Sequence, residues 1–221
     1  MLGQNFNDLS SYIDFLDKIG DLKRISTEVD PELEISEISS KTIEDNGPAL
    51  LFENVKGSSF PVATNLFGSE ERLRVSLGCN PKELGEEILS FAEKAMPPKL
   101  DNLFKSFPFI KRLTNFRSKE QAFNSPCQQI QDEITLEDLP IIKCWPEDGG
   151  KFITMGLTIT ESPISKKPNM GMYRLQMHDK ERLGMHWHPH KGGATHYHEA
   201  RQLGQDFPAA IVLGGDPSLI F

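Results

Sequence analysis

The feature that most constrains the fold is a change in hydrophobic pattern near the middle of the 221-residue chain. Before about residue 100, apolar residues recur at helical spacing between short apolar runs. From about residue 125, helical spacing fades, and short β-rich runs alternate with Pro, Gly and Asp. The pattern predicts an α+β protein with an α/β domain at 1–100, a connecting segment at 101–124, and a mostly antiparallel sheet or barrel at 125–221.

Helix and strand signals are clear in the first of these parts. Asn7 is expected to cap a helix that ends at Gly20, and residues 22–29 alternate like a half-buried strand. Asp30 followed by Pro31 predicts the start of a second helix, since proline is favoured at the first helical position. Strands are expected within 48–55 and 61–67, and further helices after Ser69 and from Asn80 to Ala95.

Composition narrows the class of protein. A net charge of −8 argues against a nucleic-acid partner, because a surface that follows phosphates needs excess Lys and Arg. The basic stretch at 105–119 lies amid four phenylalanines, Phe104, Phe107, Phe109 and Phe116, and fits an amphipathic connection within the fold. Three widely spaced cysteines form neither a metal pair nor a disulfide framework. No apolar run approaches the ~20 residues of a membrane span, and no signal peptide is evident, so we expect a cytoplasmic protein.

All six histidines lie within residues 178–198. In a strand, His186, His188 and His190 would share one face, with Pro189 placing the segment at a sheet edge. A solvated polar edge would give the same pattern. Lys191 and the Gly192-Gly193 pair follow, and they would let backbone N–H groups approach an anion such as a phosphate. The combination favours a binding site.

The neighbouring polar residues are less specific. His196 and His198 alternate and are expected at the surface or in support of a site, and His178 in a solvated turn. Asn169 offers an oxygen ligand for a hard cation, and Arg174 offers a rigid charged fork for a carboxylate or phosphate. By themselves, these two residues are better explained as a turn asparagine followed by a surface arginine.

Five ordered blocks of the chain resemble the UbiD-type decarboxylases, which include the 4-hydroxy-3-polyprenylbenzoate carboxy-lyases of ubiquinone biosynthesis. They are listed here in chain order: LKRISTEVDPELEISEI with GPALLFENVKG, DLPIIKCWPEDGGKFIT, PNMGMYRLQ, HWHPHKGG and FPAAIVLGGDP. Because the blocks span nearly the whole chain at sensible spacing, a chance match is excluded. The motifs are specific for the family and say little about the substrate.

The resemblance implies a prenylated FMN cofactor, supplied by a flavin prenyltransferase, with its phosphate held through Mn²⁺ or another divalent cation and often K⁺. By position, Asn169 and His190 resemble the metal ligands of the family. Arg174 resembles its catalytic arginine, which joins a proton-relay ion pair beside the flavin. Cofactor contacts are implied for the following residues: Met172, Tyr173, Arg174, His186, Trp187, His188, Lys191 and Gly192. Some members have Arg where His186 stands, which leaves the role of His186 open.

The family fold implies that the second part is a split β-barrel of the flavin-reductase type. The metal-binding glutamate and the proton-donating acid of the family lie beyond the FPAAIVLGGDP block, and the chain ends at Phe221. We therefore expect a truncated, N-terminal portion of a decarboxylase that is inactive alone, forms homo-oligomers at full length and is peripheral to the membrane if its substrate is prenylated. The alternatives are a non-catalytic flavin- or metal-binding module and a histidine-rich, cupin-like metal protein.

Overall fold

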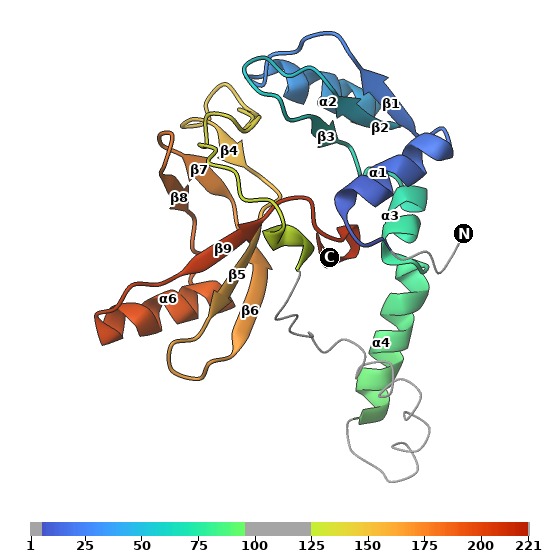
Figure 1. Cartoon of the computed structure of the whole chain (residues 1–221). Helices are drawn as coiled ribbons and strands as arrows, with labels where there is room; N and C mark the ends of the chain where they lie inside the picture. Colours follow the sequence, from blue (N-terminus) through green and yellow to red (C-terminus); the bar gives the residue numbers. More distant parts are fainter. Residues whose placement is uncertain (1–5, 96–124, 221) are drawn as a thin grey trace.

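The computed structural model describes residues 6–95 and 125–220, which form two units joined along one junction (Figure 1). The N-terminal unit contains one three-stranded sheet in the order β1-β2-β3. The second unit contains two more, in the orders β4-β7-β8 and β6-β5-β9. The connecting segment predicted at 101–124 and its basic stretch lie outside the described residues.

Helices cover both faces of the N-terminal sheet. Strand β1 (Leu22–Ile25) runs parallel to β2 (Ala49–Phe52), and β3 (Val62–Thr64) runs antiparallel to it. Helix α1 (Leu9–Lys18) packs Tyr12 and Leu16 on one side, whereas Ile35 of α2 (Glu34–Glu44) packs on the other. All four residues of β2 are buried, as expected for a central strand covered on both faces.

The two ends of α1 differ in how well they were predicted. The N-cap is Asp8 and not Asn7: the Asp8 side chain accepts the Ser11 N–H at 2.7 Å, and the Ser11 hydroxyl lies 3.4 Å from the Asp8 N–H. A carboxylate caps at least as well as an amide, so the helix begins one residue later. The predicted end of α1 at Gly20 is confirmed: Gly20 has a φ of +77°, and its N–H donates to the Asp17 carbonyl.

The predicted start of the second helix at Asp30-Pro31 is wrong. Helix α2 begins at Glu34, because residues 31–33 pair instead with the second unit. The Lys143 N–H donates to the Pro31 carbonyl at 3.1 Å, and the Leu33 N–H donates to the Lys143 carbonyl at 3.0 Å. The Asp30 carboxylate accepts hydrogen bonds from the Glu32 N–H and from the Lys56 ammonium group. Tertiary pairing therefore replaces the first helical turn.

The later helices of the N-terminal unit confirm the predictions. Helix α3 (Glu70–Leu77) is capped by the Ser69 side chain, which accepts the Arg72 N–H. Helix α4 (Pro81–Ala95) begins with proline at its first position. The described part of the chain contains no helix that is both long and apolar enough to cross a membrane. All three cysteines are free thiols.

The second unit is antiparallel throughout, as predicted. Strand β4 (Phe152–Ile153) pairs with β7 (Leu175–Met177), which pairs with β8 (Leu183–Met185). Strand β5 (Leu157–Glu161) pairs with β6 (Pro168–Met172) on one side and β9 (Ala209–Val212) on the other. Short 3₁₀ helices lie at Pro126–Gln128 and Pro217–Ile220. Among the described residues the two sheets do not close into a barrel, and the split-barrel assignment stays a prediction.

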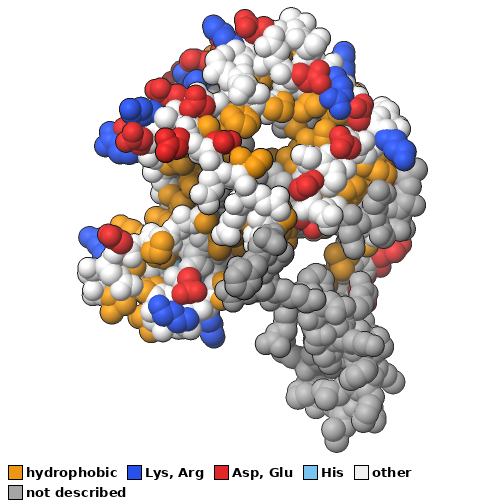
Figure 2. Space-filling model, in the orientation of Figure 1, with side chains coloured by type: hydrophobic (Ala, Val, Ile, Leu, Met, Phe, Trp, Pro, Cys, Tyr) orange, Lys and Arg blue, Asp and Glu red, His pale blue; other side chains and the backbone are white. Residues whose placement is uncertain are grey.

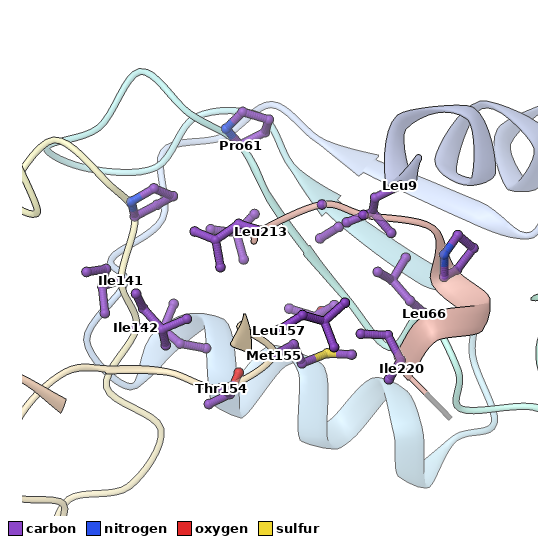
Figure 3. A pocket seen from close by; sticks show the side chains of 18 of the residues that line it. Leu9, Pro61, Leu66, Ile141, Ile142, Thr154, Met155, Leu157, Leu213 and Ile220 are labelled. Carbon is purple, nitrogen blue, oxygen red and sulfur yellow. The ribbon is translucent and has the colours of Figure 1, made fainter. Parts of the chain in front are cut away.

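An apolar junction joins the two units. The Leu9 N–H donates to the Gly214 carbonyl at 3.0 Å, and the Ser58 hydroxyl donates to the Asp138 carbonyl at 2.6 Å. Between these contacts lies a cavity of about 380 Å³, with Leu66, Ile141 and Leu213 among its lining side chains (Figure 3). Figure 2 shows hydrophobic side chains around a hollow between the units. The junction is therefore held by hydrogen bonds at its edges and is loosely filled at its centre.

Candidate functional site at the start of helix α6

The histidine-rich segment is not a strand. Strand β8 ends at Met185, residues 186–191 are irregular, and helix α6 spans Gly192–Leu203 (Figure 1). The prediction that His186, His188 and His190 share one strand face is therefore wrong. Pro189 cannot donate to a β-ladder, and the chain turns there into α6. The rings of His188 and His190 still lie together, with centroids 6.0 Å apart, and both side chains are exposed.

The two glycines at the start of α6 allow it to approach strand β6 closely. A side chain at Gly192 would collide with the Asn169 amide, and one at Gly193 would collide with Trp187 and Tyr173. The sequence therefore requires glycine at both positions for steric reasons. Asn169 and Gly192, both predicted to contribute to the site, are in direct proximity, and His190 and Lys191 immediately precede this contact in the chain.

An aromatic cluster fixes this helix start. The Gly193 N–H donates to the buried Tyr173 hydroxyl at 3.0 Å. The Tyr173 ring meets Trp187 edge-on at 4.9 Å, and Trp187 packs further against Tyr197 and Phe207. The side chains of Tyr173 and Trp187 are thus occupied by internal packing. If Tyr173 and Trp187 contact a cofactor, they do so in addition to this structural role.

The start of α6 has the chemistry of an anion or metal-phosphate site. Lys191 is the N-cap residue, and its side chain makes no capping hydrogen bond. Free N–H groups and the positive end of the helix dipole attract anions. Beside them, Asn169 Nδ2 is buried without a hydrogen-bond partner. Rotation of the amide by 180° exchanges Nδ2 and Oδ1, so this buried group can present an oxygen to a cation.

Asn169 and His190 stay predicted metal ligands, and two side chains do not form a complete site. The described part of the chain contains no group of three or more His, Cys, Asp or Glu side chains placed to hold a metal. A divalent cation at Asn169 would therefore need ligands from a bound phosphate, from water or from residues outside the described ranges.

Arg174 lies at a second, adjoining site. A pocket of about 500 Å³ is lined by Phe152, Arg174, Gln176, Gly184, Met185 and His186. The guanidinium carbon of Arg174 lies 3.7 Å from the centroid of the Phe152 ring, and its Nη2 donates to Asp148 Oδ2 at 2.8 Å. The His186 N–H donates to the Arg174 carbonyl at 3.2 Å. Arg174 and His186, both predicted to belong to the site, are thus brought together.

Sequence reasoning missed the acidic partner of Arg174. Asp148 lies in the PEDGG loop, far from Arg174 in the chain, and no local signal links the two residues. Of the two places predicted for His196, the surface is excluded: His196 is buried on α6, and its Nδ1 lies 3.0 Å from Thr160 Oγ1. His178 and His198 are exposed, as predicted.

Comparison with known proteins gives a consistent result. Residues 13–92 match the N-terminal domain of 3-octaprenyl-4-hydroxybenzoate carboxy-lyase, and residues 118–221 match its Rift-related domain. An evolved dimeric form of the UbiD-class enzyme HmfF from Pelotomaculum thermopropionicum, in complex with prFMN, is 26% identical over 96% of this chain and 45% of its own, with a TM-score of 0.74. An FMN complex of HmfF is 27% identical over 95% of this chain and 43% of its own, with a TM-score of 0.74.

A third match shows the fold alone. The closed form of vanillic acid decarboxylase from Sedimentibacter hydroxybenzoicus is 24% identical over 99% of this chain and 45% of its own, with a TM-score of 0.77. The chain thus spans less than half the length of these solved chains.

Proposed function

Because the chain belongs to the UbiD family of carboxy-lyases, we propose that it carries the cofactor-binding half of a prenylated-FMN-dependent decarboxylase. The observation that carries the proposal is that two sites follow each other directly along the chain. Strand β6 holds Asn169 against the start of α6, and the chain continues directly into Arg174 and its pocket. A flavin mononucleotide has a dianionic phosphate at one end and a flat ring system at the other, which matches such a pair of sites.

At the α6 end, the proposed occupant is the FMN phosphate. The helix N-terminus and Lys191 supply positive charge, Asn169 and His190 would hold Mn²⁺ to neutralise the phosphate, and K⁺ is proposed as a further ion. Both glycines at the helix start keep this surface free of side chains. The site therefore depends on backbone N–H groups as much as on side chains.

At the other end, Arg174 is the proposed group for the substrate carboxylate. Asp148 and the Phe152 ring hold the Arg174 guanidinium in one orientation, so its N–H donors are already oriented before a ligand binds. When bound, the modified flavin supplies the electron sink for loss of CO₂. The chain's own contribution is to orient the acid, through Arg174, and to keep the cofactor in place.

The proposed substrate is an aromatic or unsaturated carboxylic acid, with 4-hydroxy-3-polyprenylbenzoate of quinone biosynthesis as the specific candidate. A flavin prenyltransferase would supply the cofactor. Since the solved relatives are more than twice as long, we further propose that the 221-residue chain retains the flavin but does not turn over substrate alone.

The proposal is tested by producing the chain together with a flavin prenyltransferase and Mn²⁺ and recording the visible flavin absorbance after gel filtration. We expect retained flavin in the wild type and a loss of about tenfold or more in retention for Asn169→Ala and His190→Ala. His198→Ala is the matched control, because His198 is exposed on α6 beyond the helix start. Equal retention in all four proteins would refute the metal assignment, and absence of flavin from the wild type would refute the function.

Decarboxylation is measured on the same flavin-loaded protein. Carbon dioxide release from aromatic acids is expected at background level. Robust turnover by the 221-residue chain would show that the proposed division between a cofactor half and a missing acid-bearing half is wrong.

A further inference from the structure

The contact between α6 and strand β5 is unusually polar for a buried helix–sheet interface. Thr158 and Thr160 of β5 and Ser162 directly after it are each at most 2% exposed. Thr160 Oγ1 lies 3.0 Å from His196 Nδ1, and Ser162 Oγ donates to Glu199 Oε2 at 2.5 Å. Five polar side chains therefore lie at this interface. An apolar interface would provide the packing without the polar desolvation cost, so the hydrogen bonds must contribute something that packing does not.

We propose that the Thr160–His196 hydrogen bond is a positioning contact that sets the place of α6 along the sheet and thereby holds Asn169 against the helix start. Thr160 lies directly opposite Asn169 in the β5–β6 pairing, on the same face of the sheet. On α6, His196 follows Gly192 by four residues, so the two lie on one face of the helix. The Thr160–His196 hydrogen bond thus connects the strand neighbour of Asn169 to a residue one helical turn after Gly192.

Directionality explains why polar residues serve this role. Ala194 and Ala200 of α6 are also buried, and small apolar residues such as these have no directional contact that would resist a shift of the helix along the sheet. A shift of one helical turn, about 5.4 Å, would leave the Thr160 hydroxyl and His196 unpaired and buried. The Ser162–Glu199 hydrogen bond farther along α6 adds a second fixed point, so both position and tilt of the helix are set.

The inference rests on the proposed function for its ligand, since the positioned surface is the one that would receive the FMN phosphate. Thr160 and His196 are buried beneath that surface and act through Asn169 and the helix start. They are therefore positioning residues. A change at either should alter how tightly phosphate and metal are held, and not merely how stable the fold is.

The chain offers a matched pair of substitutions for the test. Thr160→Val removes the hydroxyl that meets His196 and keeps the shape of the side chain. Thr158→Val makes the same change two residues away on the same buried face, where the hydroxyl has no hydrogen-bond partner. Thr160→Ser restores a hydroxyl at the critical position. FMN binding is measured by fluorescence titration with and without Mn²⁺, alongside thermal unfolding.

We expect Thr160→Val to reduce the Mn²⁺-dependent gain in FMN affinity by about tenfold, the range seen when groups that orient metal ligands are removed. Thr158→Val should change it less than twofold, and Thr160→Ser should recover most of it. If both valine variants behave alike, or if Thr160→Val lowers only the unfolding temperature, the positioning role is refuted. Should Thr160→Val not fold, Thr160→Ala is compared with Thr158→Ala in its place.

Failure of the proposed function would look different, because the wild type itself would then not bind FMN. In that case amide hydrogen exchange of Gly193 decides the inference, since its N–H donates to Tyr173 only when α6 is correctly placed. Exchange at Gly193 should be about tenfold faster in Thr160→Val than in Thr158→Val. Equal exchange rates would overturn the positioning role without reference to any ligand.

Discussion

At the scale of single residues, the Tyr173 hydroxyl fixes the start of α6 directly, because it accepts the Gly193 N–H. Tyr173→Phe keeps the aromatic packing but removes the acceptor for the Gly193 N–H. Because a buried donor would lose its partner, we expect a cost of about 1–2 kcal/mol in the free energy of unfolding. Chemical denaturation of wild type and variant measures this difference.

Tyr197→Phe is the matched control for that experiment. Tyr197 belongs to the same aromatic cluster, but it is partly exposed and its contacts there are between rings. Its substitution should change stability by less than about 0.5 kcal/mol. Equal effects of the two variants would mean that ring packing, and not the hydrogen bond, holds the helix start.

The residue scale also shows what the sequence could and could not reveal. Asn169 and Arg174 carry no signal by themselves; they became candidates only through the resemblance of a long ordered pattern. The structure then brings Asn169 to Gly192 and Arg174 to His186. Asp148 could not be predicted, because its pairing with Arg174 arises from how the loop before β4 folds back over the sheet.

At the scale of elements, the capping of α1 gives a pH-dependent prediction. The Ser11 backbone N–H, with help from the Ser11 side chain, holds the pKa of Asp8 below its usual value. The ionised form is therefore favoured in the folded state, and its contribution is present above the unfolded pKa and lost as pH falls through the folded one. Asp8→Ala should cost about 1 kcal/mol near pH 7. This difference should shrink below about pH 3 to the smaller contribution of an uncharged capping oxygen.

Two further substitutions separate charge from capping. Asp8→Asn keeps a capping oxygen without the charge, so its stability relative to Asp8→Ala should depend little on pH. Asp14→Ala changes an exposed carboxylate in the middle of the same helix and removes no cap. A pH dependence shared by Asp14→Ala and Asp8→Ala would indicate general charge effects. Urea denaturation across this pH range provides the measurement.

Helix α6 shows why some elements escaped prediction. Histidines at alternate positions suggested a strand, and Gly, Thr and Tyr are weak helix formers. The signals for a helix were present at its end: Ala200, Arg201 and Leu203 favour helix, and Gly204 terminates it with φ of +65°. By contrast, α3 and α4 were predicted well because a capping serine and an Asn-Pro pair mark their starts. A helix was thus predicted where a local signal marks its first residue, and α6 was missed because its signals lie at its end.

At the scale of the whole molecule, the two units share hydrophobic contacts as well as backbone pairing. Ile142 belongs to the second unit, yet it packs against the buried cluster of Val29, Ile35 and Phe52 in the first. It also lines the junction cavity (Figure 3). The sequence predicted two separate domains from their differing patterns, and it gave no indication of this shared packing, since the contact joins residues about a hundred positions apart.

This packing predicts that the units unfold together. Ile142→Ala should destabilise the protein by about 1–2 kcal/mol, less than for a fully buried isoleucine because Ile142 is only partly buried. If the junction couples the units, calorimetry will show one transition that moves to lower temperature as a whole by about 2–8 °C. Ile164→Ala, at a position that is 62% exposed, should leave the transition in place. Two resolved transitions, with only the first unit's affected by Ile142→Ala, would show that the units are energetically independent and that the junction serves only to align them.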